Sequence, residues 1–413
     1  MRSARTILAS LLPFWLYLAF FKFGGGLHYT LMSPYGEFFF PVWVIGILIG
    51  GTSLVQLLLD VPAGYLLDRF GYVRMLKVTT CAFLLAGLCI ALGLSQVSYV
   101  LSLILAIFGW QFYGPGGSAY ILSQATDLES GRYFSLRETF GSIGIVCASV
   151  SLPLVLLVSP HIAGILLCAL FGVSLFLLYL VPKDKAPVES HIIARHMRRR
   201  PLWHIVTDMR RLNPASSMLM LLSFFGAVFY GVIWFVVPLV IAGQQANAEI
   251  MGLGLAVFDF SVVVLGYVLG TLADRTDKKM LVFFGLLGFS IFGVLVGLNF
   301  GLLFILFGFL ATTGEEMADI SLWSWMHHLD KDHTADGTVS SVISFFEDFG
   351  WAVGPVVAGV LYTLTGPALS ISIGAAPLFI VWVIYYMFVH KHFPYKLHYS
   401  PLPHRIPRRK HKS

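Results

Sequence analysis

Twelve long apolar runs, separated by short polar stretches, leave this chain few ways to fold. The runs lie near residues 6–30, 40–66, 76–95, 98–124, 135–158 and 161–182, and again near 215–242, 249–272, 279–298, 300–325, 339–364 and 367–390. An apolar run of about 20 residues is long enough to cross a bilayer as a helix. Only 12% of the residues are charged, against about 25% in soluble domains. We therefore expect an all-α membrane protein with twelve transmembrane helices, because a β-barrel would show short alternating segments.

The basic residues indicate how these helices are oriented. If both termini are cytoplasmic, the basic stretch 183–214, the C-terminal tail and the loops with Arg69 and Arg275 all lie inside. The loops on the opposite side then contain no Lys or Arg. Because basic residues accumulate in cytoplasmic loops, we predict that both termini are cytoplasmic. The net charge of +6 is then a sign of topology, and it gives no reason to expect nucleic-acid binding.

Two short motifs recur at nearly the same separation and show that the chain is a repeat. Gly64, Asp68 and Arg69 correspond to Gly270, Asp274 and Arg275, and ETFG at Glu138 corresponds to EDFG at Glu347. Parallel repeats of six helices occur in transporters. We therefore predict four segments: a first six-helix bundle over 1–182, a basic cytoplasmic linker over 183–214, a second bundle over 215–391 and a basic tail over 392–413.

This layout resembles the major facilitator superfamily, and in particular its bacterial proton-coupled multidrug and metabolite transporters. The loop after the second helix of that family reads G-x-x-x-D-R-x-G followed by basic residues, and here Gly64, Asp68, Arg69 and Gly71 match it. Tyr72 and Val73 occupy the basic positions. The fourth helix lacks the arginine common in proton antiporters, and the fifth lacks the G-x-x-x-G-P run common in exporters. The resemblance implies transport by alternating access, and both absences weaken the case for drug export.

The repeated loop motif predicts a cytoplasmic gate. Glycines allow a tight turn, carboxylates can cap helix ends, and arginines can bridge to acids at neighbouring helix ends. A plain turn in a positively charged loop is the alternative. The gate candidates are Asp60, Gly64, Asp68, Arg69, Gly71, Arg74, Asp127, Arg137, Glu138, Gly270, Asp274, Arg275 and Glu347.

Carboxylates inside the apolar runs are the candidates for proton coupling. Glu315 and Asp319 are four residues apart and share a helix face, and Glu316 lies beside them. Asp259 lies in another run. Ionisable residues at membrane depth are costly, so each suggests a function. A structural ion pair, for example with Lys22, or an acid in a water-filled mouth is the alternative.

The candidates for a substrate cavity are polar and aromatic residues within the runs. The segment GWQFYGPGGSAY contains Pro115 and several glycines, which predict a loosened or kinked helix. Aromatic rings suit an apolar or cationic ligand, although packing or lipid contact is the alternative for each ring. The candidates are Lys22, Gln111, Tyr113, Tyr120, Tyr230 and Trp234.

These observations favour a secondary active transporter of a small organic molecule in the plasma or inner membrane. We expect a monomer in the lipid bilayer, with the proton as coupling ion and with no enzymatic activity, cofactor, metal or nucleic acid. The loop HHLDKDH, which begins at His327, has no fixed metal-ligand spacing. Efflux of an amphipathic compound is favoured over uptake or facilitated transport of a sugar or organic anion. The alternative of another class is a non-transporting membrane sensor or scaffold.

Overall fold

The computed structural model describes residues 11–124, 130–182, 214–243, 248–329 and 336–392. These residues form helices joined by short turns, and no strand occurs among them. Nine stretches of the described chain are long and apolar enough to cross a membrane. The last, Val342–Phe388, contains two spans because the chain turns at Gly366. With α2 and α14, which carry ionisable residues at mid-helix, they make up the twelve predicted spans.

The first six spans are built from seven helices. These are α2 (Leu12–Gly36), α3 (Val42–Phe70), α4 (Tyr72–Ala91), α5 (Gln96–Gln111), α6 (Tyr113–Gln124), α7 (Ser130–Leu156) and α8 (Pro160–Leu180). The second six spans are α11 (Pro214–Gly243), α12 (Ala248–Arg275), α13 (Lys278–Gly297), α14 (Leu302–Leu329), α15 (Asp336–Ala375) and α16 (Pro377–His392). The predicted linker and tail lie outside the described residues.

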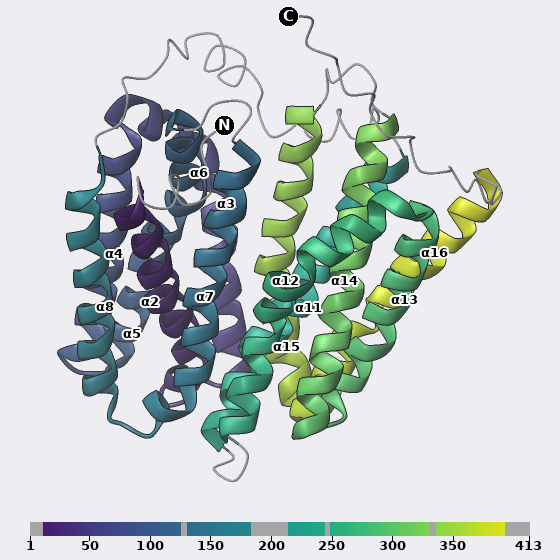
Figure 1. Ribbon diagram of the computed structural model, residues 1–413. Helices are drawn as coiled ribbons and strands as arrows, with labels where there is room; N and C mark the ends of the chain where they lie inside the picture. Colours follow the sequence, from purple (N-terminus) through teal and green to yellow (C-terminus); the bar gives the residue numbers. More distant parts are fainter. Residues whose placement is uncertain (1–10, 125–129, 183–213, 244–247, 330–335, 393–413) are drawn as a thin grey trace, which may run out of the picture.

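Figure 1 shows the two sets of helices side by side, with α2 to α8 on the left and α11 to α16 on the right. We call them the first and second bundles. The side on which α2 begins and α16 ends is called the terminal side, and the opposite side the far side. The predicted architecture of twelve spans in two bundles is confirmed.

Local backbone geometry explains where helices break or turn. The fourth span is divided at Phe112, where α5 ends and α6 begins, as the glycines and Pro115 led us to expect. Pro115 has no N–H to continue the helical hydrogen bonding, which favours such a break. Gly71 has φ 89° between α3 and α4, and Gly366 has φ 78° within α15. These positive φ values favour glycine, so both turns depend on it.

The bundles pack against each other in the far halves of their helices. A methyl group at Gly46 would lie 2.3 Å from the Pro355 carbonyl oxygen, and one at Gly50 would lie 2.3 Å from that of Ala352. These glycines bring α3 into backbone contact with α15, which we call the α3–α15 contact. Likewise, a methyl group at Gly252 on α12 would lie 2.7 Å from Pro153 on α7. The far side is therefore closed by two pairs of helices.

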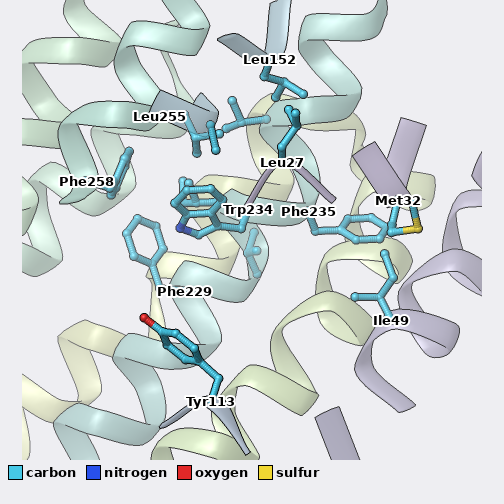
Figure 2. Close-up of a cluster of buried hydrophobic side chains, with 14 of the residues drawn as sticks. Leu27, Met32, Ile49, Tyr113, Leu152, Phe229, Trp234, Phe235, Leu255 and Phe258 are labelled. Atoms are coloured by element: carbon cyan, nitrogen blue, oxygen red, sulfur yellow. The ribbon is translucent and has the colours of Figure 1, made fainter. Parts of the chain in front are cut away.

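Side chains complete this closure. Figure 2 shows Leu27 and Leu152 of the first bundle in one buried apolar cluster with Trp234, Phe235 and Leu255 of the second. Toward the terminal side, by contrast, Glu138 on α7 and Glu347 on α15 are exposed. The contacts between the described parts of the two bundles thus lie toward the far side, whereas these two glutamates toward the terminal side are exposed.

Candidate transport site

Three carboxylates lie within little more than one turn of α14. Glu315, Glu316 and Asp319 are all partly buried. The Tyr230 hydroxyl on α11 donates a hydrogen bond to the Glu315 carboxylate. A methyl group at Gly226, one turn before Tyr230, would lie 3.2 Å from Glu315 Oε1. The absence of a side chain at Gly226 therefore leaves room for this carboxylate against α11.

Two more acids complete a group that we call the carboxylate cluster: Asp259, Glu315, Glu316, Asp319 and Glu347. Asp259 on α12 is within electrostatic range of Glu316, and Glu347 on α15 is within range of Glu315 and Asp319. The Trp323 indole N–H donates a hydrogen bond to Asp319. Acids from three helices of the second bundle thus converge on one region.

Lys22 faces this region from α2 in the first bundle. Its ammonium lies 5.2 Å from the centre of the Trp110 ring and 5.3 Å from that of Tyr113. Both distances are typical of cation–π contacts. Asp259 and Glu347 are within electrostatic range, but Lys22 forms no ion pair with any described residue. The ion pair with Lys22 that we considered as an alternative role for the α14 acids is therefore absent from this structure.

The charge on the two sides of the site is unequal. The second bundle contributes the five acids of the carboxylate cluster. The first bundle contributes Lys22 and the adjacent residues Arg137 and Glu138, which form an ion pair with each other. Because acids are in excess, the site as a whole favours cations, whether protons or positively charged solutes.

A row of aromatic rings crosses from one bundle to the other beside these charges. The Tyr230 ring lies nearly parallel to that of Trp351 on α15, with centroids 6.4 Å apart. Trp351 in turn meets Tyr29 on α2 edge to face, at 6.3 Å. Phe258 on α12 packs edge to face against Tyr230 at 6.0 Å. Flat apolar ring surfaces and carboxylates therefore lie close together here.

The remaining predicted cavity residues are distributed differently. Tyr113 is buried and stacks on Phe21, with centroids 4.5 Å apart, beneath the Lys22 ammonium. Gln111 is buried at the break in the fourth span. Trp234, one turn after Tyr230 on α11, belongs to the buried apolar cluster shown in Figure 2. Tyr120 packs against Phe14 within the first bundle and donates to the carbonyl oxygen of Pro182, so the structure does not bring it to the carboxylates.

The structure describes only some of the predicted gate residues. Arg69 is exposed, with its guanidinium 5.4 Å from the ring centre of Phe70, and Arg74 is also exposed. Gly71 makes the turn described above. Asp127 lies outside the described residues. The described part of the structure also leaves out the side chains of Asp60, Asp68, Asp274 and Arg275 and the surroundings of Gly64 and Gly270. The repeated glutamates Glu138 and Glu347 are within electrostatic range of each other.

Sequence reasoning missed three aromatic residues that the structure places in the site: Trp351, Trp323 and Tyr29. Trp351 follows Glu347 by four residues in EDFGW, so both lie on one face of α15. Trp323 follows Asp319 by the same spacing on α14. Both tryptophans could therefore have been found by looking one turn beyond each carboxylate. Tyr29 carries no such signal. Within the described residues, no group of His, Cys, Asp and Glu is placed to hold a metal ion.

Comparison with known proteins identifies the family. The sequence profile of the Major Facilitator Superfamily matches residues 6–333. The chain belongs to this superfamily. One curated relative, the multidrug resistance protein MdtH of Proteus mirabilis (strain HI4320), is 26% identical over 170 residues. That match covers 40% of this chain and 42% of MdtH. The chain therefore aligns with less than half the length of that relative.

Solved structures of the same fold include transporters of two kinds. The nucleoside transporter NupG superposes with a TM-score of 0.69 at 13% identity, covering 93% of this superfamily member and 100% of NupG. A POT family transporter in complex with a thioalcohol-conjugated peptide gives a TM-score of 0.68 at 10% identity, covering 92% and 96%. At such low identity these likenesses show the fold alone. This superfamily member is a multi-pass membrane protein with the fold of a transporter.

Proposed function

We propose that this superfamily member is a secondary active transporter that works by alternating access and exchanges protons for an amphipathic organic solute. The observation that carries the proposal is Glu315, which lies mid-helix in α14, accepts a hydrogen bond from Tyr230 and is surrounded by further carboxylates. A carboxylate at membrane depth that can hold or release a proton suits proton coupling. The solute binds between the bundles, and the cell membrane is the expected location.

The surroundings of Glu315 support an amphipathic solute moving outward. The excess of acids favours a positive group, and the rings of Tyr230, Trp351 and Trp110 favour an apolar body. The name of the MdtH relative, a multidrug resistance protein, points the same way. Lys22 favours the second candidate, the uptake or facilitated transport of an organic anion or another metabolite, because its ammonium has no ion-pair partner in the site.

Proton flux into proteoliposomes tests the proposal. Purified protein would be reconstituted with a pH-sensitive dye inside the vesicles, and amphipathic cations, neutral sugars and organic anions would be added in turn. We expect one class of solute to evoke a proton flux that falls at least about tenfold in Glu315→Gln, because the neutral amide cannot carry a proton. Glu316→Gln tests the neighbouring acid in the same assay.

Glu249→Gln is the matched control, since Glu249 is exposed in the first turn of α12 and lies outside the carboxylate cluster. It should leave the flux unchanged. Solute movement without proton flux, equal in all variants, would contradict proton coupling. If no solute of any class moved, the transport proposal itself would fail and a sensor or scaffold would be favoured.

A further inference from the structure

Tyr230 joins two parts of the site that lie on different helices. Its hydroxyl donates to Glu315 on α14, while its ring lies against Trp351 on α15 at a centroid distance of 6.4 Å and an interplanar angle of 18°. One side chain therefore contacts both the central carboxylate and the helix that closes the far side.

Trp351 lies directly beside the α3–α15 contact. The next residue, Ala352, supplies the carbonyl oxygen that packs against Gly50 of α3. The Trp351 ring also meets Tyr29 of the first bundle edge to face. A displacement of the Trp351 ring would therefore disturb the surface on which the two bundles meet.

The packing of α11 on α15 leaves little room for either ring to move independently. A methyl group at Gly354 would lie 2.7 Å from the Val228 carbonyl oxygen, and one at Gly231 would lie 2.9 Å from the Gly354 Cα atom. A methyl group at Gly350 would likewise lie 2.4 Å from the Phe224 carbonyl oxygen, so the two backbones are in direct contact both before and after the Tyr230–Trp351 pair. Closely packed interiors transmit displacements rather than absorb them.

We propose that Tyr230 is a positioning residue that makes the α3–α15 contact depend on the protonation of Glu315. The proposal rests on the proposed function in that it takes Glu315 as the proton site. A hydrogen bond to an ionised carboxylate is about twice as strong as one to a neutral group. Ionised Glu315 holds Tyr230 against Trp351 and keeps the far side closed. Protonation weakens the bond, frees the ring and allows the far side to open.

This arrangement meets a requirement of obligatory exchange. An exchanger must not change conformation when it carries neither proton nor solute, because the gradient would then be dissipated. In the empty, deprotonated carrier the Tyr230–Glu315 bond opposes opening of the far side. Either a proton on Glu315 or a positive group bound beside it weakens the bond and permits the change.

Several other charged groups surround Glu315, and the test must separate their effects. Glu316 and Asp319 lie on its own helix, and Glu347 reaches it from α15. From α12, Asp259 acts on Glu316 and Tyr230. On α13 the lysines are confined to the first turn, at Lys278 and Lys279. Removing the Tyr230 hydroxyl changes the bond to Glu315 and leaves all of these charges in place.

The test is a distance measurement across the closed far side as a function of pH. Spin labels would replace Phe38 and Leu364, which are exposed on either side of the α3–α15 contact. The four cysteines, Cys81, Cys89, Cys147 and Cys168, would be changed to alanine. The full chain would be held in lipid nanodiscs without solute, and electron–electron double resonance would give the populations of short and long distances.

In the otherwise native protein we expect the long-distance population to rise as pH falls. Tyr230→Phe keeps the ring but removes the bond, so the ratio of long to short distances at high pH should rise about tenfold and its pH dependence should disappear. Glu315→Gln should give the same result. The control is Tyr385→Phe, which removes another buried tyrosine hydroxyl, one that donates to the Lys279 carbonyl oxygen, and it should behave like the native protein.

A second variant covers the case in which Tyr230→Phe fails to fold. Gly226→Ala would place a methyl group 3.2 Å from Glu315 Oε1 and displace the carboxylate without changing Tyr230, and we expect the same loss of pH dependence. The proposal is overturned if Tyr230→Phe follows the native pH curve, or if the native populations do not respond to pH. Proton-coupled transport by the same preparation would show that the proposed function survives in either case.

Discussion

Lys22 places a positive charge in the middle of α2, where no described carboxylate forms an ion pair with it. Its ammonium is held over the rings of Trp110 and Tyr113. An ion at membrane depth costs about 2.5–3.5 kcal/mol on insertion scales, so the cation–π contacts and the nearby acids must offset much of this cost. Because the Lys22 ammonium lies in the site, its positive charge should affect which solutes bind.

Lys22→Met is therefore expected to strengthen the binding of a cationic solute. A neutral side chain of similar length removes a repulsion on the order of 1 kcal/mol, or about fivefold in Kd, across the site. Binding of radiolabelled tetraphenylphosphonium to the purified protein measures the effect. Lys22→Arg keeps the charge and should leave Kd within about twofold of the native value. A weaker affinity in Lys22→Met would show that the lysine helps to bind the solute.

At the residue scale, spacing along the chain predicted which carboxylates share a face but not what they contact. Glu315 and Asp319 belong together because they are four residues apart. The partner of Glu315, Tyr230, is 85 residues away, and only the packing of α11 on α14 brings the two together. Tyr120 illustrates the same limit, because its spacing suited a cavity while the rotation of α6 turns it toward Phe14.

At the element scale, close approach of helices depends on single glycines. A methyl group at Gly144 on α7 would lie 2.3 Å from the Ala19 carbonyl oxygen and 2.9 Å from Lys22 Cβ. Backbone atoms cannot yield as a flexible side chain can, so α7 and α2 would have to separate.

Gly144→Ala should therefore lower the free energy of unfolding by about 1–3 kcal/mol through overpacking. Gly141→Ala, one turn earlier on the same helix, is the matched control, because its methyl group would meet only side-chain atoms 3.9 and 4.0 Å away. It should leave stability unchanged or raise it slightly, since alanine favours helix more than glycine does. Thermal unfolding in detergent measures both, and equal Tm values would contradict the packing argument.

Helix positions were predictable from the sequence to within a few residues, because apolar length is set by the bilayer. The break in the fourth span was expected near Pro115 and occurs at Phe112. The eleventh apolar run was predicted to end at residue 364 and the twelfth to begin at residue 367, and the chain turns between them at Gly366. The extension of α3 to Phe70 was not predicted, because the polar end of that helix no longer looks like a membrane span.

At the scale of the whole molecule, closure of the far side rests on contacts between backbones. Gly50→Ala would place a methyl group 2.3 Å from the Ala352 carbonyl oxygen, whereas one at the adjacent Gly51 would have nothing within 4 Å. Gly50→Ala should disfavour closure by about 1–3 kcal/mol. The distance between labels at positions 38 and 364 should lengthen in Gly50→Ala and remain native in Gly51→Ala. Equal distances in the two variants would show that a methyl group at position 50 does not disfavour the contact between α3 and α15.

The repeat could be predicted because two motifs recur at nearly the same separation in the sequence. The number of spans could be predicted because each apolar run is long enough to cross a bilayer. Which side of the carrier is closed could not, since the glycines at positions 46, 50 and 359 become informative only when α3 and α15 are placed together. The second bundle's excess of acids was visible in the sequence, but its position opposite Lys22 required the fold.

The site of Lys22 also bears on how the chain enters the membrane during synthesis. α2 precedes the other described spans in the chain, and the residues that surround its lysine are supplied by α5, α6 and α7. Those helices leave the ribosome some 90 to 120 residues later, as the numbering shows. Until then the nascent α2 lacks the partners that make its charge tolerable in lipid. We therefore expect the stable insertion of α2 to depend on helices that are synthesised after it.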